Sequence, residues 1–467
     1  MPGGSRARRA PRARDAAASA GARWAWTLAV LSALGSVACT ARLTEEQLKD
    51  PATCEGCHTE IYREWSGSMH AYAGDDPIFR AMNAYGQAQT NGALGDLCVR
   101  CHAPLALREG LTVDGTNLDE VPASRRGVTC YFCHQVDRVT GTHNAAMELA
   151  GDAVMRGGRA DPLETPAHDS AYSSLHDRDQ LESSSLCGAC HDIVNGQGFA
   201  LERTYKEWQG SLYSNPSGRE RLSCQSCHMP SRVGLAANVE GAPERRVRGH
   251  MFPGVDLALI DWPEREAQRA AVQRELDATL LASLCVVPGA AGATVSVDLE
   301  AVATGHHFPS GAAPDRRLWI ELVAYQRGRV VFQSGVVPDR RPVPSIADPH
   351  LVLYRDRTFR ADGTEAKQLF EVVRAEPNVL LAPVTREPTD PRFGETHSVT
   401  RFPIPTLPDR VTLRVRLQPI GREILDELVQ AGYLDLALAD AMPRLTLGSA
   451  SLEWTADSGE LCQPIRR

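Results

Sequence analysis

The pattern of hydrophobic and polar residues divides the chain into two parts with different periods. Beyond residue 285 apolar and polar side chains alternate, and a period of two places every second side chain on the same face of a strand. The predicted strands are 294–301, 318–325, 330–337, 410–417 and 445–454. Arg327-Gly328 fits a hairpin turn, and a short helix over 420–431 is expected to end at Gly432. This pattern predicts a β-sandwich.

The part before residue 255 shows few strand patterns and is rich in Gly, Asp and Ser. A helix is predicted over 59–73, because Ile61, Trp65 and Met69 recur every four residues on one face. A second helix is predicted over 263–284 and would connect the two parts. The fold class expected is a mainly α or irregular domain followed by a β-sandwich domain.

Five copies of Cys-x-x-Cys-His supply the chemistry of the first part. Their cysteines are Cys54 and Cys57, Cys98 and Cys101, Cys130 and Cys133, Cys187 and Cys190, and Cys224 and Cys227; their histidines are His58, His102, His134, His191 and His228. Two thiols at this spacing can form thioethers to one porphyrin, and the next imidazole then binds the iron. Zinc is the alternative, but it does not require a histidine after every pair, and five pairs leave one unmatched. We expect five c-type haems, whose apolar surface would replace much of an ordinary core.

A six-coordinate haem iron needs a second ligand, usually His or Met. The candidates are His70, His143, His168, His176, His250 and His306. His70 lies twelve residues beyond His58 in the predicted helix, a rise of roughly 18 Å, so it would serve a neighbouring haem. Met251 competes with His250, and His307 with His306, whereas His350 and His397 are expected to be ordinary polar residues.

The N-terminus predicts export. Residues 1–38 combine an arginine-rich start with an uncharged apolar run over 24–38, which is too short to span a bilayer and is typical of a signal peptide. Cys39 follows a sequence similar to a lipoprotein box, and cleavage after Ala38 or Ala41 is the alternative. We expect a periplasmic or outer-membrane and cell-surface protein, with any membrane attachment through lipid at Cys39. The net charge of −8 gives no indication of nucleic-acid binding.

Two cysteines lie after the last motif. Cys285 and Cys462 most simply form a disulfide in an oxidising compartment, and two separate buried thiols are the alternative.

Several segments resemble multihaem cytochromes of the cytochrome c-554 type. They are Cys54–Ala73, Gly127-Val128-Thr129 before the third motif, Leu186–Asp192 with Thr204–Trp208, and Cys227-His228-Met229-Pro230. Gly305–Leu318 is similar to a β domain appended to some relatives. The resemblance implies stacked haem pairs, mostly bis-histidine ligation and electron transfer, with His70 matching a distal ligand. The type member has four haems, so ligand pairings are not carried across.

The sequence therefore predicts a signal peptide over 1–38, a pentahaem cytochrome c domain over 39–255, a connecting helix over 256–285 and a β-sandwich domain over 286–467. The expected function is a relay of single electrons to redox partner proteins, either other cytochromes or a quinol-linked complex, without catalytic residues. The alternative is a haem oxidoreductase that acts on a small nitrogen or sulfur compound at a five-coordinate haem. The supply of spare histidines favours the relay.

Overall fold

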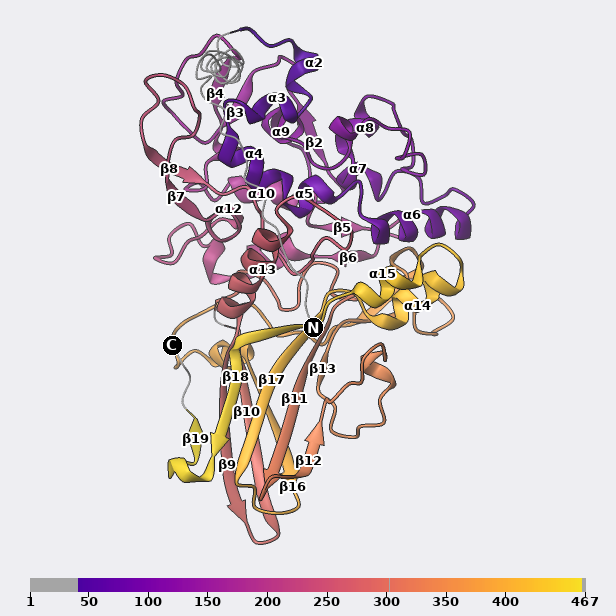
Figure 1. The fold of residues 1–467 in the computed structure, drawn as a ribbon, viewed down its shortest axis with the longest axis vertical. Coiled ribbons are helices and arrows are strands. Elements are labelled where there is room, and N and C mark those ends of the chain that lie inside the picture. The colour runs from indigo at the N-terminus through magenta and orange to yellow at the C-terminus, as the bar shows by residue number, and fades with distance from the viewer. Residues whose placement is uncertain (1–40, 302, 464–467) are drawn as a thin grey trace, which may run out of the picture.

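The computed structural model describes residues 41–301 and 303–463, so the expected signal peptide and Cys39 lie outside the described residues. Figure 1 shows a helical and irregular N-terminal region above a β-rich C-terminal region. Within the described residues, the helices are all too short or too polar to cross a membrane.

The N-terminal region consists of short helices joined by long irregular segments. The α-helices are α2 Glu45–Leu48, α3 Ala52–Glu55, α4 Thr59–Ser66, α5 Met69–Tyr72, α6 Pro77–Gln89, α7 Val99–His102, α8 Pro104–Arg108, α9 Cys130–His134, α10 Ser183–Gly188, α11 Thr204–Gly210 and α12 Cys224–His228. The 3₁₀ helices are η1 Ala123–Arg125, η2 Ser174–His176 and η3 Leu212–Ser214. Four two-stranded sheets pair β1 Val136–Val139 with β2 Met147–Leu149, β3 Met155–Gly157 with β4 Ser170–Tyr172, β5 Ile193–Val194 with β6 Ala200–Glu202, and β7 Ser231–Gly234 with β8 Arg245–Arg248.

The helix predicted over 59–73 is broken into α4 and α5. Gly67 ends α4, and the Ser68 hydroxyl accepts a hydrogen bond from Ala71 N–H to begin α5. A side chain at position 67 would lie 2.6 Å from Cβ of Glu264, so glycine permits this close approach to the start of α13 (Arg265–Thr279). The break redirects His70 away from the axis of α4.

The described part of the C-terminal region contains two larger antiparallel sheets and a two-stranded one that pairs β14 with β15. One of the larger sheets has the order β16-β10-β9-β19 and the other β12-β11-β17-β18, with β13 paired to β11. Their strands are β9 Leu281–Gly289, β10 Gly292–Glu300, β11 Arg317–Gln326, β12 Arg329–Ser334, β13 Leu353–Tyr354, β16 His397–Ile404, β17 Arg410–Gln418, β18 Leu445–Thr455 and β19 Cys462–Gln463. The remaining elements are β14 Arg357–Phe359, β15 Arg374–Glu376, α14 Arg422–Gln430, α15 Leu436–Ala441, η4 Val343–Ser345, η5 Leu369–Glu371, η6 Pro391–Thr396 and η7 Ala456–Ser458. Leu284 and Val295 of one sheet share a core with Ile320 and Val415 of the other.

The predicted connecting helix is wrong at its C-terminal end. Helix α13 ends at Thr279, and β9 begins at Leu281. Buried Ala282, Leu284 and Val286 alternate with partly exposed residues, so these positions follow the period of a strand. The expected disulfide is confirmed, because Cys285 of β9 and Cys462 of β19 are bonded across two paired strands.

Packing joins the two regions. Ile78 and Ala81 of α6 form an apolar cluster with Leu425 and Leu428 of α14. The Arg316 guanidinium binds both carboxylate oxygens of Asp256 at 2.7 Å, which adds a bidentate ion pair to this junction.

Candidate haem-binding site

All five Cys-x-x-Cys-His motifs line one cavity of about 1200 Å³. A pocket for one drug-sized ligand is ~300–1,000 Å³, so this space is larger than a single ordinary ligand needs. The ten motif cysteines and five motif histidines all face it, together with His70, His168, His176, His250 and His306. His143 does not line the cavity and is exposed.

Cysteines of different motifs meet inside the cavity. A hydrogen bond between buried thiols links each of three pairs: Cys54 with Cys130, Cys101 with Cys190, and Cys187 with Cys224. The first motif therefore adjoins the third, the second adjoins the fourth, and the fourth adjoins the fifth. Haems attached at these cysteines would lie next to one another.

Each motif histidine is oriented through its Nδ1 atom. The Nδ1 atom of His58 donates to the carbonyl of Ala236 at 2.7 Å. In the same way, His102 donates to the Ala73 carbonyl at 3.1 Å and His228 to the Pro253 carbonyl at 2.8 Å. His134 is bonded in the same way to the Arg156 carbonyl, and His191 Nδ1 lies 3.5 Å from a carboxylate oxygen of Glu202. This is the usual arrangement around a metal-binding histidine, because it leaves Nε2 available for the metal.

Four motif histidines face a second histidine at the spacing that one iron between them requires. The ring centroids are 6.2 Å apart in His58–His168, 6.3 Å in His191–His70, 6.5 Å in His134–His250 and 6.2 Å in His228–His306. Two metal–nitrogen bonds of ~2 Å, with ~1 Å more from each nitrogen to its ring centre, give about 6 Å between centroids. The residues present therefore fit bis-histidine haem iron at four positions.

His134 has a second neighbour, His176, with ring centroids 5.4 Å apart. The Nε2 atom of His176 is already hydrogen-bonded to the Cys133 carbonyl at 2.9 Å. His250 instead uses Nδ1, which donates to the Arg248 carbonyl at 3.0 Å. His250 thus leaves Nε2 free for a metal, whereas His176 leaves only Nδ1 free.

His102 is the one motif histidine without a second histidine. Its ring stacks on Phe79 of α6, with centroids 3.9 Å apart and planes 7° apart. All fourteen histidines lie within the described residues. Among those outside the four pairs, His307 accepts a hydrogen bond from Ala382 N–H, His350 contacts Phe332 and His397 lies beside Asp298. The expectation that spare histidines would close every iron is not met at His102.

His70 lies at the centre of this arrangement. Burial, and to a smaller extent the neighbouring rings of His191, His250 and His228, lowers its pKa to about 3. His70 is therefore a neutral imidazole among candidate ligands of three motifs, as a metal-binding histidine must be. That His70 serves a haem other than that of His58 stays a prediction, and its ring lies beside His191 of the fourth motif.

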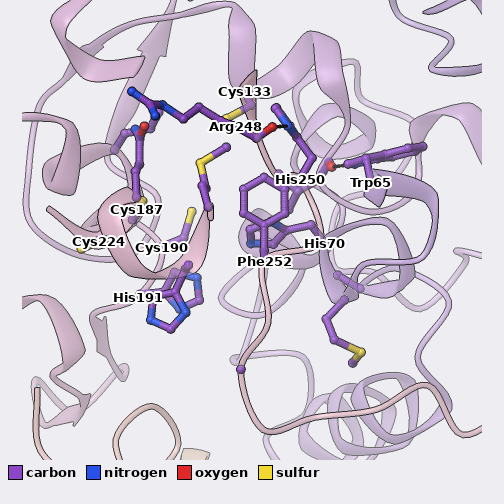
Figure 2. A pocket seen from close by; sticks show the side chains of 18 of the residues that line it. Trp65, His70, Cys133, Cys187, Cys190, His191, Cys224, Arg248, His250 and Phe252 are labelled. Atoms are coloured by element: carbon purple, nitrogen blue, oxygen red, sulfur yellow. Dashed lines mark hydrogen bonds between the residues drawn. The ribbon is translucent and has the colours of Figure 1, made fainter. Parts of the chain in front are cut away.

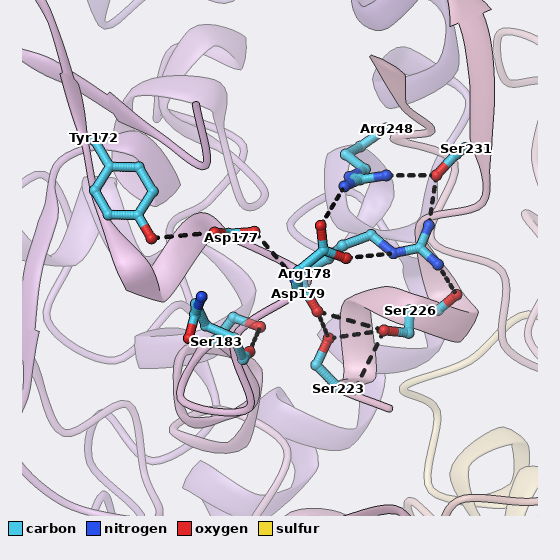
Figure 3. Close-up of polar contacts among 10 residues, drawn as sticks. Tyr172, Asp177, Arg178, Asp179, Ser183, Ser223, Ser226, Ser231 and Arg248 are labelled. Carbon is cyan, nitrogen blue, oxygen red and sulfur yellow. Dashed lines mark hydrogen bonds and ion pairs between the residues drawn. The ribbon is translucent and has the colours of Figure 1, made fainter. Parts of the chain in front are cut away.

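Two guanidinium groups meet at the cavity wall and fit the carboxylates of a porphyrin. Figure 3 shows Arg178 and Arg248 converging on the hydroxyl of Ser231, to which Arg248 donates at 2.6 Å. Asp179 is their nearest carboxylate, at 4.0 and 3.5 Å, and its side chain is 75% exposed. Burial lowers the pKa of Arg248, and the charge of Arg178 lowers it further. An anionic group would relieve this repulsion.

Sequence reasoning missed the residues that act by shape or by backbone position. Phe79, Phe252 and the carbonyls of Ala73, Ala236 and Pro253 carry no motif, because any residue type supplies a carbonyl. Arg178 and Arg248 are two of many arginines in the sequence, and only the fold brings them together.

Comparisons with known proteins agree with the site. Residues 53–135 match a family described as cytochrome c554 and c-prime. The structure is similar to a penta-heme cytochrome c552 from Thermochromatium tepidum, with a TM-score of 0.61 and 22% identity over 89% of this chain and 99% of that chain. No curated protein matched the chain. At this identity the structural likeness shows the fold.

Proposed function

We propose that the chain is a multihaem c-type cytochrome that relays single electrons along five covalently bound haems, because residues 53–135 match the cytochrome c554 and c-prime family and the fold is similar to that of a penta-heme cytochrome c552. The observation that carries the proposal is the set of four histidine pairs whose ring centroids lie 6.2–6.5 Å apart. An iron with a histidine on each face exchanges electrons without changing its ligands, which suits transfer and disfavours substrate binding.

The five motifs form one contiguous array in this proposal. His58 adjoins His134 through their shared neighbour His168. His134 is linked to His191 through His250 and His70, whose rings both contact Phe252. His191 lies near both His102 and His306, the partner of His228. An electron that enters at any motif therefore has a neighbouring site to move to.

The protein's own part in the relay is orientation and exclusion of water. Backbone carbonyls hold the Nδ1 atoms of four of the five motif histidines, and the Glu202 carboxylate lies beside that of His191. Carbonyls also hold His168 at 3.1 Å and His306 at 2.9 Å. Fixed imidazoles need little rearrangement when the charge on the iron changes, and a buried site varies little in polarity. Bound haem supplies the one-electron redox chemistry.

Electron paramagnetic resonance of the oxidised holoprotein tests the relay. We expect four low-spin signals per chain, one for each histidine pair. The relay proposal would be contradicted if most of the irons were high spin, because the pairs would then not bind iron.

His102 supports a second candidate function, reduction or oxidation of a small nitrogen or sulfur compound at one open haem. The supporting observation is the absence of any second histidine facing His102 among the described residues, all fourteen histidines included. Nitrite and hydroxylamine are the probes. A high-spin signal that disappears when one equivalent binds, with turnover lost in Cys98→Ser/Cys101→Ser, would favour the enzyme. A protein that binds neither compound would be a relay alone.

Export, the periplasmic or cell-surface location and lipid at Cys39 also remain proposals, as do the cytochrome or quinol-linked partners. The absence of a membrane-crossing helix from the described residues is compatible with lipid attachment. Labelling with radioactive palmitate, with Cys39→Ala as control, tests the lipid. We further infer that the two larger C-terminal sheets form a β-sandwich, because residues of both share one core.

A further inference from the structure

The segment from Arg248 to Pro253, here called the 248–253 segment, contacts candidate iron ligands of three motifs. The Arg248 carbonyl accepts from Nδ1 of His250, which faces His134 of the third motif. The Pro253 carbonyl accepts from Nδ1 of His228, the motif histidine of the fifth motif. Between them, the Phe252 ring contacts His70, which faces His191 of the fourth motif.

Phe252 lies between two candidate distal ligands. Its ring centroid is 4.5 Å from that of His70 and 5.5 Å from that of His250, and Figure 2 shows it beside both imidazoles at the centre of the pocket. The ring is edge-on to His250 at 79° and tilted by 54° against His70. An aromatic ring in contact with two imidazoles limits the rotation of both.

The backbone at Phe252 is strained in the way that functional positions often are. Its φ is +47°, in the left-handed region that a bulky residue rarely adopts. Neighbouring contacts hold this conformation, because His250 N–H donates to Glu64 at 2.9 Å and Glu64 is paired with Arg232 at 3.1 Å. Glycine would adopt the same φ without strain, so the large ring is present despite an energetic cost to the backbone.

We propose that Phe252 is a positioning residue that sets the orientation of the distal imidazoles His70 and His250 together, and so couples the properties of the haems at the third and fourth motifs. This inference deepens the relay proposal and rests on it. The junction between these two motifs joins the His58–His134 side of the array to the His191–His228 side. One side chain therefore contacts the candidate distal imidazoles on both sides of this junction.

The ring orientation of an axial imidazole affects the electronic properties of its iron, because it fixes which iron orbitals the ligand overlaps. Removing the Phe252 ring frees both imidazoles at once, so two haems should change together. The pairs His58–His168 and His228–His306 do not contact Phe252 and should not change. If Phe252 only filled space, its removal would lower the stability of the protein without changing the properties of two particular haems.

The test uses the full holoprotein with Phe252→Gly, Phe252→Leu and Phe252→Tyr. Phe252→Gly removes the ring and also relieves the left-handed φ, so it should fold even where Phe252→Leu does not. Phe252→Tyr keeps the ring and is the rescue. Phe370→Leu is the matched control, since Phe370 lines the same cavity but contacts Tyr85.

Low-temperature electron paramagnetic resonance and spectroelectrochemistry are the readouts. His70→Ala and His250→Ala first identify the two signals, since each removes one. With Phe252→Gly we expect those two signals to shift their g-values and the corresponding midpoint potentials to change. The other two low-spin signals should remain in place, and Phe252→Tyr should restore the wild-type spectrum.

The inference is overturned if Phe252→Gly shifts neither assigned signal, shifts only one, or shifts all four alike. These outcomes are separate from failure of the relay proposal, which is judged on the wild-type protein by the number of its low-spin signals. If the wild type shows the four signals and Phe252→Gly leaves them unchanged, the relay stands and the positioning role is wrong.

Discussion

The ring nitrogen that is hydrogen-bonded to the backbone distinguishes candidate iron ligands that the sequence left open. His250 and His176 both lie beside His134, but His250 is held through Nδ1 and His176 through Nε2. Only the first arrangement leaves the nitrogen remote from the chain free for iron. This distinction depends on which carbonyl lies nearby, and so on tertiary structure.

We predict that His250→Ala converts one low-spin haem to high spin, whereas His176→Ala leaves the low-spin count unchanged. The two variants form a matched pair, since both remove an imidazole next to His134. The near-infrared charge-transfer band and electron paramagnetic resonance measure the result. A high-spin haem in His176→Ala with none in His250→Ala would reverse the assignment.

Asp315 gives a prediction for the dependence of stability on pH. Its side chain is 4% exposed, and burial raises its pKa from 3.8 to about 6, although Arg316 and Arg317 oppose the shift. Because the folded state keeps the proton to a higher pH than the unfolded state, this group stabilises the fold below pH 4. That contribution is lost as the pH rises through about 6, and its size is on the order of 2–3 kcal/mol.

Asp315→Asn should therefore flatten the pH dependence of the free energy of unfolding between pH 4 and pH 6, and should stabilise the protein at pH 8. Denaturant unfolding at several pH values measures this effect. Asp457→Asn, at an exposed carboxylate, is the control. An unchanged slope in Asp315→Asn would show that the buried carboxyl does not titrate in this range.

At the scale of elements, the period of two predicted five strands of the C-terminal region correctly and missed β9, β16 and the shorter strands. Residues 281–284 were assigned to the connecting helix, since Leu, Ala and Ser are compatible with a helix when read as its continuation. The deciding interactions are pairing to β10 and to Cys462 on β19, which lies at the far end of the chain. Short-range propensity cannot detect a partner 177 residues away.

The disulfide should stabilise this sheet and leave the haems unaffected. Replacing both Cys285 and Cys462 by Ala removes a cross-link between residues 177 positions apart. This change should lower the free energy of unfolding by about 2–5 kcal/mol. Calorimetry should give a lower melting temperature, while the visible spectrum at 25 °C stays that of the wild type. Equal melting temperatures would mean that the cross-link contributes nothing measurable.

For the whole molecule, the sequence predicts the motif residues directly because thioether formation and proximal ligation depend on five adjacent positions. Distal ligands depend on approach between distant segments, as between His70 and His191 or between His228 and His306. The sequence has more spare histidines than distal positions and predicts that His350 and His397 are ordinary polar residues, but it does not show which of the other histidines approach which motif. That no second histidine among the described residues faces His102 was consequently not predicted.

The complete protein should carry five haems. The mass of the exported protein, measured by intact mass spectrometry, should exceed the mass of the mature polypeptide by that of five haem groups, because all five motifs line the cavity. Removing one motif by Cys224→Ser/Cys227→Ser should lower the number to four. Fewer than five groups in fully matured wild-type protein would contradict the prediction.

The position of His306 has a consequence for biogenesis. His306 follows every attachment motif in the sequence and faces His228 from the β-rich side of the molecule. During synthesis all five attachment sites emerge before the residue that completes the last of them. If His306 is the second ligand at the fifth motif, haem could be attached there before folding of the C-terminal half brings His306 to it. The order of residues along the chain thus allows haem to be attached to the fifth motif before His306 approaches it.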